Sequence, residues 1–61
     1  MKFLRIPWKD LLVSVQDIEG VWRNGDLIVI EYYGGESIRH TFDKLADAMT
    51  AFDSIAQQLT K

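Results

Sequence analysis

Two glycine-containing dipeptides set the strongest limit on how this chain can fold. Asn24-Gly25 and Gly34-Gly35 each separate two runs rich in β-branched and aromatic residues. A two-residue hairpin loop of type I′ needs positive φ at both central positions, which Asn-Gly and Gly-Gly adopt at little energetic cost. The sequence therefore predicts two consecutive β-hairpins, with strands at about residues 18–23, 26–33 and 36–42.

These two turns also predict which residues share a face of the sheet. With Asn24-Gly25 at the centre of the first turn, Arg23 lies opposite Asp26, and opposite charges suit directly opposed positions. The same rule applied to both turns assigns the core face to Ile18, Trp22, Leu27, Val29, Tyr33, Ile38 and Phe42, together with Glu31, Glu36 and His40. The second face then carries Glu19, Val21, Arg23, Asp26, Ile28, Ile30, Tyr32, Ser37, Arg39 and Thr41.

Two further strands are predicted before the hairpins. Residues 2–6 are short and apolar, and Pro7 ends them because proline cannot donate to a ladder. Residues 11–16 alternate between apolar and polar positions in the period of a strand. The connection to the next strand stays open, because Gln16-Asp17 can form a turn or Leu11 to Trp22 can form one long bulged strand.

After Phe42 the period of the apolar residues changes to that of a helix over about residues 43–60. Asp43 is a suitable N-cap because its carboxylate can accept unpaired backbone N–H groups of the first turn. The predicted apolar stripe comprises Leu45, Met49, Phe52, Ile55, Ala56 and Leu59. Residues 1–61 thus form a single α+β domain, an antiparallel meander of four to five strands with one C-terminal amphipathic helix packed on one face.

The length of the chain bears on its assembly. A chain of 61 residues buries only about 60% of its unfolded surface and usually needs reinforcement from disulfides, metals or oligomerisation. There is no cysteine and only one histidine, His40, so disulfides and ordinary zinc sites are excluded. Oligomerisation is the reinforcement that remains.

The central strand is apolar on both faces, which points to a cover on each side. The expected interface on the face away from the helix comprises Val21, Arg23, Ile28, Ile30, Tyr32 and Arg39. A second copy of the chain can cover this face, which predicts a homodimer. Alternatively, the N-terminal segment curls over it with Phe3, Trp8 and Leu12.

The sequence contains no constellation of catalytic residues. His40 lacks a nucleophile on its own face, and there is no cysteine, so we expect a non-enzymatic protein without cofactor or metal, and a structural or surface His40. The net charge of −2 disfavours nucleic-acid binding. The alternative function is a single-stranded nucleic-acid-binding module that stacks bases on Tyr32 and contacts phosphates through Arg23 and Arg39.

The expected function is an interaction module that dimerises and binds a protein or peptide partner. A peptide could add to a free edge strand, either around Ile38 to Phe42 or around Lys2 to Ile6. No membrane-length segment is present and the polar helix face lacks a basic stripe, so we expect a cytoplasmic protein that does not bind membranes. The layout, with its Gly-Gly hairpin and alanine-rich helix, resembles many short prokaryotic and phage proteins and, in outline, small flagellar and swarming accessory proteins.

Overall fold

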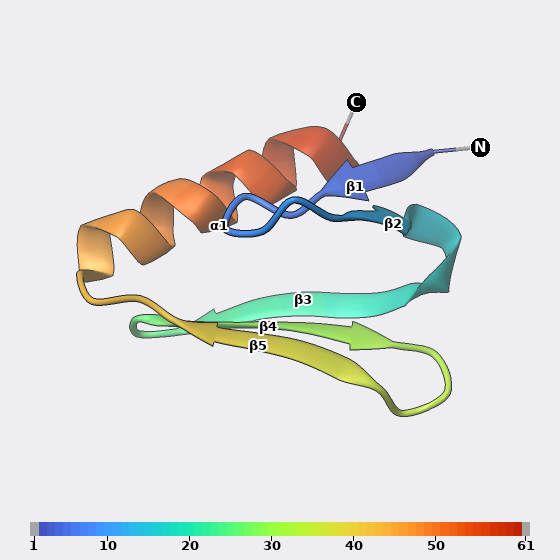
Figure 1. The fold of residues 1–61 in the computed structure, drawn as a ribbon, viewed down its shortest axis with the longest axis horizontal. Coiled ribbons are helices and arrows are strands. Elements are labelled where there is room, and N and C mark those ends of the chain that lie inside the picture. Colours follow the sequence, from blue (N-terminus) through green and yellow to red (C-terminus); the bar gives the residue numbers. More distant parts are fainter. Residues whose placement is uncertain (1, 61) are drawn as a thin grey trace.

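A computed structural model describes residues 2–60 and confirms the α+β fold (Figure 1). The five strands form two antiparallel sheets rather than one continuous meander. The helix begins two residues later than predicted, and the strand bounds lie within two residues of those predicted. The elements in chain order are β1 (Phe3–Arg5), β2 (Leu12–Ser14), the single 3₁₀ turn η1 (Val15–Asp17), β3 (Ile18–Asn24), β4 (Leu27–Tyr32), β5 (Ser37–Thr41) and α1 (Leu45–Leu59).

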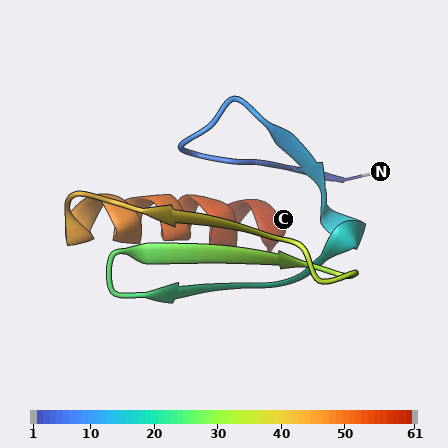
Figure 2. The same cartoon turned by 60° about the horizontal axis from the view of Figure 1, so that its bottom comes forward.

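The elements are arranged in two layers. One layer is the sheet β3–β4–β5, and the other contains α1 and the β1–β2 hairpin (Figure 1). Both covering elements lie on the same side of the sheet, and a second view shows the same arrangement (Figure 2). The described part of the chain therefore leaves one face of the three-stranded sheet without a covering element.

The first hairpin turns one residue later than predicted. Asn24 pairs with Leu27, so Gly25 and Asp26 are the central residues, and Gly25 has φ of 63°. No described residue other than glycine has positive φ, so this turn belongs to type II′, which needs glycine only at its first central position. Moving the turn by one residue slides the pairing by two, so Trp22 still shares a face with Val29.

The second hairpin slips by an odd number of residues, which changes the face of β5. The Tyr32 N–H donates to the Glu36 carbonyl at 2.8 Å, so three residues form the loop rather than two. Gly34 and Gly35 both have positive φ, at 103° and 94°, but Tyr33 lies in the loop with them. Ile38 therefore pairs with Ile30 rather than with Glu31.

This slip decides which face of the sheet is buried. With Ile38 beside Ile30, the isoleucines gather on one face, and α1 and the hairpin pack there. The prediction that the helix covers the face of Trp22 and Val29 was wrong for this reason. The buried cluster consists of Leu4, Ile6, Ile28, Ile30, Ala51 and Ile55.

The N-terminal segment is a hairpin that covers part of this core. Leu4 and Ile6 are 0% and 1% exposed, and Ile6 closes the hairpin by donating its N–H to the Leu11 carbonyl at 3.0 Å. The connection from β2 to β3 is the single turn η1 around Gln16, and a bulge follows between Ile18 and Gly20. Of the two predicted connections, the turn is the one observed.

The helix packs through small residues. Ala48 and Ala51 are buried with Ile55, whereas Leu45 and Met49 are 52% and 47% exposed. Alanine allows α1 to lie close to the sheet, which rotates part of the predicted stripe toward solvent. The exposed part of that stripe is Leu45, Met49 and Ala56, and the remaining members Phe52, Ile55 and Leu59 contact the core. Asp43 is not the N-cap; Lys44 occupies that position without a side-chain hydrogen bond.

A side chain from α1 pairs with the outer edge of β1. The Arg5 N–H donates to Gln58 Oε1 at 2.8 Å, and Gln58 Nε2 donates to the Arg5 carbonyl at 3.0 Å. The glutamine amide thus bonds to Arg5 as a neighbouring strand would. This edge, predicted as a possible site for an added peptide strand, is occupied at Arg5 by the chain itself.

Candidate functional site

The residues predicted to form an interface do not lie together on an open surface. Ile28 and Ile30 are 0% exposed within the single chain, where α1 and the β1–β2 hairpin cover them. Val21 and Tyr32 pack against the same core. The prediction that these side chains face away from the helix was wrong, because the slip at the second turn gathers the isoleucines on the covered face. Of the two covers considered for these side chains, the N-terminal segment is the one observed, together with the helix. Of its three predicted contacts only Trp8 packs on the core; Phe3 and Leu12 are exposed, because alternation along the strands turns Leu4 and Ile6 inward instead.

The two arginines of the predicted interface lie on opposite faces of the sheet. Arg23 is the cross-strand partner of Ile28, and Arg39 is the cross-strand partner of Val29. Tyr32 lies on the covered side with Arg23. The three residues proposed for nucleic-acid binding are therefore not brought together on one face.

The face of the sheet opposite α1 is the surface that the fold leaves available (Figures 1 and 2). Side chains alternate along a strand and cross-strand partners share a face, so the register assigns residues to it directly. We call this surface the open face, and it consists of Gly20, Trp22 and Asn24 on β3, Glu31, Val29 and Leu27 on β4, and Ser37, Arg39 and Thr41 on β5.

The middle of the open face is a row of three cross-strand neighbours, Trp22, Val29 and Arg39. Val29 is 0% exposed although no helix or strand of the described chain covers this face. The side chains beside it, the indole of Trp22 and the aliphatic stem of Arg39, are the groups placed to shield it from water. The second apolar face of β4 is thus sealed by its own neighbours rather than by another layer.

Trp22 is held in place while much of its ring remains accessible. Its Nε1 donates to Glu31 Oε1 at 2.8 Å, and the residue is 40% exposed. A buried or half-buried indole usually bonds through its N–H, and here the partner lies on the same face. The ring therefore presents a fixed apolar surface at the centre of the open face.

The open face carries one carboxylate and one guanidinium. Glu31 is engaged by the Trp22 indole. Arg39 has no ion pair or hydrogen bond from its side chain within residues 2–60, although it lies one strand away from Glu31. The face is consequently neutral overall, and it contains a cation without a partner in the described chain.

The outer edge of β5 adds backbone groups beside this face. The ladder bonds from Tyr32 to Glu36 and from Phe42 to Asp26 mark hydrogen-bonded pairs at each end of β5. Because such pairs alternate with non-bonded pairs, the backbone N–H and C=O groups of intervening residues point away from β4. These residues are Ser37, Arg39 and Thr41.

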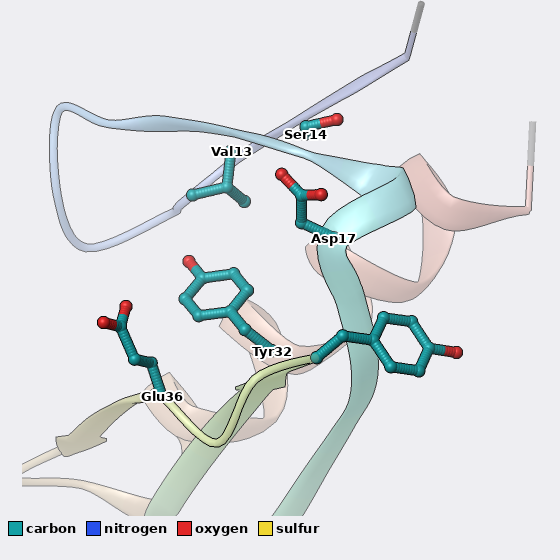
Figure 3. A pocket seen from close by; sticks show the side chains of 6 residues that line it. Val13, Ser14, Asp17, Tyr32 and Glu36 are labelled. Atoms are coloured by element: carbon teal, nitrogen blue, oxygen red, sulfur yellow. The ribbon is translucent and has the colours of Figure 1, made fainter.

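A cleft of about 360 Å³ lies between the β1–β2 hairpin and the loop that joins β4 to β5 (Figure 3). Asp17 and Glu36 place carboxylates on either side of the Tyr32 hydroxyl. Burial, with the negative charges of Glu36 and Asp17, raises the pKa of the Tyr32 phenol above its usual value. Ser14 also lines the cleft, and its Oγ is buried without a hydrogen-bond partner. Local sequence patterns do not indicate this cleft, because its lining comes from two segments, residues 13–17 and 32–36, that only the fold brings together.

His40 packs in an aromatic cluster. Its ring is stacked on Trp8 with centroids 5.2 Å apart and planes 11° apart. Phe42 meets the His40 ring edge-on at 4.5 Å. The contact fastens the hairpin to β5, which is a structural role. His40 does not share a face with Glu31, since β5 is turned over relative to the prediction.

Within residues 2–60, no three side chains among histidine, aspartate and glutamate come close enough together to hold a metal ion. None of the described helices has the length and apolar character needed to cross a membrane. No protein-family model matches the chain, and no curated protein or solved structure is significantly similar to it.

Proposed function

We propose that this chain is a non-enzymatic protein-interaction module whose contact surface is the open face. The observation that carries the proposal is Trp22, which is 40% exposed at the centre of that face and is fixed by its bond to Glu31. Tryptophan and arginine are enriched among residues that dominate binding energy, and they act best near the centre of an interface. Trp22 and Arg39 flank Val29 in that central row.

The composition of the open face supports the same function. Interfaces are enriched in aromatic residues and arginine and depleted in lysine, aspartate, glutamate and serine. The open face has Trp22 and Arg39 in its middle row and no lysine or aspartate; its one glutamate is bonded to the indole, and its one serine lies at the edge. Because Trp22 is already ordered in the free chain, its side chain loses less conformational entropy when a partner binds.

The cytoplasm is the compartment we propose for this function. The chain has no cysteine, so its fold needs no oxidising environment.

The test is photo-crosslinking at a defined position. A benzoylphenylalanine residue replaces Trp22 in one variant, and a matched control carries it in place of Leu45, an exposed apolar residue of α1. Both variants are irradiated in an extract of cells that naturally make the chain. Discrete crosslinked products, to this chain or to another protein, are expected from position 22 and not from position 45.

Two results would contradict the proposal. One is an identical set of products from both positions, which would show that crosslinking follows exposure alone. The other is the absence of any product from position 22 while the variant remains folded by circular dichroism.

A further inference from the structure

We propose that the open face binds the open face of a second copy, with the two sheets crossing at nearly a right angle. In this arrangement Arg39 of each subunit lies over Glu31 of the partner subunit, and Trp22 lies over the partner's Leu27. The inference rests on the proposed function and names the partner for that same surface. It is argued from the positions of charges on the face and from the shape of the face.

The register places the open-face residues on a small grid. Trp22, Val29 and Arg39 form the middle row across the three strands. Along β4, Glu31 and Leu27 lie on either side of Val29. Val29 is thus the centre of a cross whose four arms are an indole, a guanidinium, a carboxylate and an isobutyl group.

Two such faces can be stacked by a twofold axis that lies between them. The axis lies along the diagonal that runs between the Arg39 arm and the Glu31 arm of the cross. It places the middle row of one subunit over β4 of the other. The strands of the two sheets therefore cross at about 90°, one of the two usual ways in which sheets pack. The axis then superposes the guanidinium arm on the carboxylate arm and the indole arm on the leucine arm. Each contact occurs twice because the pairing is isologous.

Aligned packing fails on charge. A twofold axis parallel to the strands places Glu31 over the same residue of the partner, and an axis across the strands does so for Arg39. Like charges directly opposed across an interface destabilise it. Among twofold axes that pass over Val29, only a diagonal one avoids both contacts, and the diagonal described above also pairs the unlike charges.

The charge on Arg39 fits this role. Its side chain has no ion-pair or hydrogen-bond partner in the part of the chain that the structure describes. Glu31 gives one carboxylate oxygen to the Trp22 indole, and its other oxygen has no bond to a described residue. A second copy supplies the missing partner for both groups.

The size of the face allows crossed packing with partial overlap. Three strands about 4.8 Å apart, each with five to seven residues at about 3.3 Å rise, give a footprint of roughly 14 by 20 Å. Turning one sheet by 90° keeps an overlap of roughly 14 by 14 Å, about two thirds of the footprint, and this overlap contains the cross centred on Val29. The footprint is smaller than the roughly 800 Å² per partner of a standard interface, so the Kd of the dimer is expected to be micromolar or weaker.

The experiment exploits the symmetry of the pairing. Arg39→Glu places four carboxylates in the homodimer interface, and Glu31→Arg places four guanidinium groups there. Each variant is expected to weaken dimerisation by roughly tenfold or more, measured by sedimentation equilibrium over a concentration series. An equimolar mixture of the two variants restores both unlike pairs in a heterodimer. The mixture is therefore expected to associate more tightly than either variant alone, although less tightly than the original chain, because Glu31→Arg also removes the acceptor of the Trp22 indole in one subunit.

Control variants distinguish the crossed dimer of open faces from a dimer through another surface and from an aligned dimer. Leu12→Ser removes an apolar side chain that is 57% exposed on the outer side of the hairpin, and it is expected to leave dimerisation unchanged. Glu31→Gln keeps an acceptor for the Trp22 indole. It is expected to weaken a crossed dimer, whereas it would strengthen an aligned dimer in which two Glu31 carboxylates meet. Circular dichroism and thermal unfolding verify that each variant is folded.

Several outcomes would overturn the inference. A chain that stays monomeric at millimolar concentration excludes self-association, yet crosslinking of position 22 to another protein would leave the proposed function standing. A dimer that Leu12→Ser dissociates, or that Arg39→Glu leaves unchanged, uses a different surface. A mixture of the two charge variants that remains monomeric rejects the crossed pairing. If a charge variant is unfolded, Glu31→Gln and Arg39→Gln replace it, and both are expected to weaken the dimer.

Discussion

The bond between Gln58 and the edge of β1 gives a sharp prediction for stability. Arg5 donates its N–H to the amide oxygen at 2.8 Å and accepts from the amide nitrogen at 3.0 Å. Gln58→Ala removes both bonds and leaves the backbone of Arg5 without them. The contact joins residues 53 positions apart, so it fastens the N-terminal hairpin to the C-terminal helix.

The magnitude follows from the number of bonds and their exposure. A typical hydrogen bond contributes about 0.5–1.5 kcal/mol to net stability. Both bonds lie at the surface, where water can partly replace them, so the pair is expected to contribute about 1–2 kcal/mol. A chain of this length has a total stability of about 3–9 kcal/mol, at about 0.05–0.15 kcal/mol per residue. For a domain of this size, such a loss lowers the melting temperature by roughly 4–16 °C.

The assay is urea unfolding followed by far-ultraviolet circular dichroism, with Gln57→Ala as the matched control. Gln57 precedes Gln58 on the helix, is exposed, and has no side-chain bond to any described residue. Both substitutions change helix propensity equally, so the difference between them isolates the contact with Arg5. A difference below about 0.5 kcal/mol would refute the reasoning, since it would mean that water replaces the amide at no cost.

Three further predictions concern the core, a turn and the cleft. Ile30→Ala should reduce the free energy of unfolding by about 2–5 kcal/mol. Val29 is equally buried but is sealed only by its neighbours on the open face, so Val29→Ala should reduce this free energy by only about 1–2 kcal/mol, because the site can collapse. Equal losses per removed carbon in chemical denaturation would contradict this prediction. Gly25→Ala should destabilise the chain by about 1–2 kcal/mol, because φ is 63° there, whereas Gly20→Ala, with open space and no positive φ, should be neutral or slightly stabilising in thermal melts. In a Tyr33→Phe chain, absorbance of the phenolate should show that the pKa of Tyr32 lies above 10. Because the pKa is raised in the folded state, the contribution of the neutral phenol to stability is complete below pH 10 and is lost as pH rises through the folded pKa. A phenol that titrates at or below pH 10 would contradict this prediction.

Local patterns in the sequence were sufficient for the elements. The two glycine turns, the apolar runs and the change of period after Phe42 predicted four to five strands, with two hairpins at the glycine turns, and a C-terminal helix; the structure has five strands, both hairpins and the helix. The apolar character of both faces of β4 was also evident, because residues 27–30 are all apolar; the expected cover on the second face is not provided by another layer of the described chain. These features depend on backbone propensity and on side-chain period, which are properties of short segments.

The open face could not be assigned in this way. Two adjacent glycines allow a two-residue or a three-residue loop, and the choice between them turns β5 over. The observed loop includes Tyr33, which moves Ile38 to the face of Ile30 and Arg39 to the face of Val29. The sequence contained the signal, since only the three-residue loop unites the isoleucines, but local turn chemistry does not select it.

The amino-acid sequence by itself determined where strands and helix form, because those depend on neighbours within a few residues. The tertiary structure alone decided which side of the sheet is buried. That outcome depends on the joint packing of Ile30, Ile38 and Ile55 with the N-terminal hairpin, and such packing between distant segments has no counterpart in local periodicity. The same packing leaves Trp22 and Arg39 on the uncovered side, where the candidate interface lies.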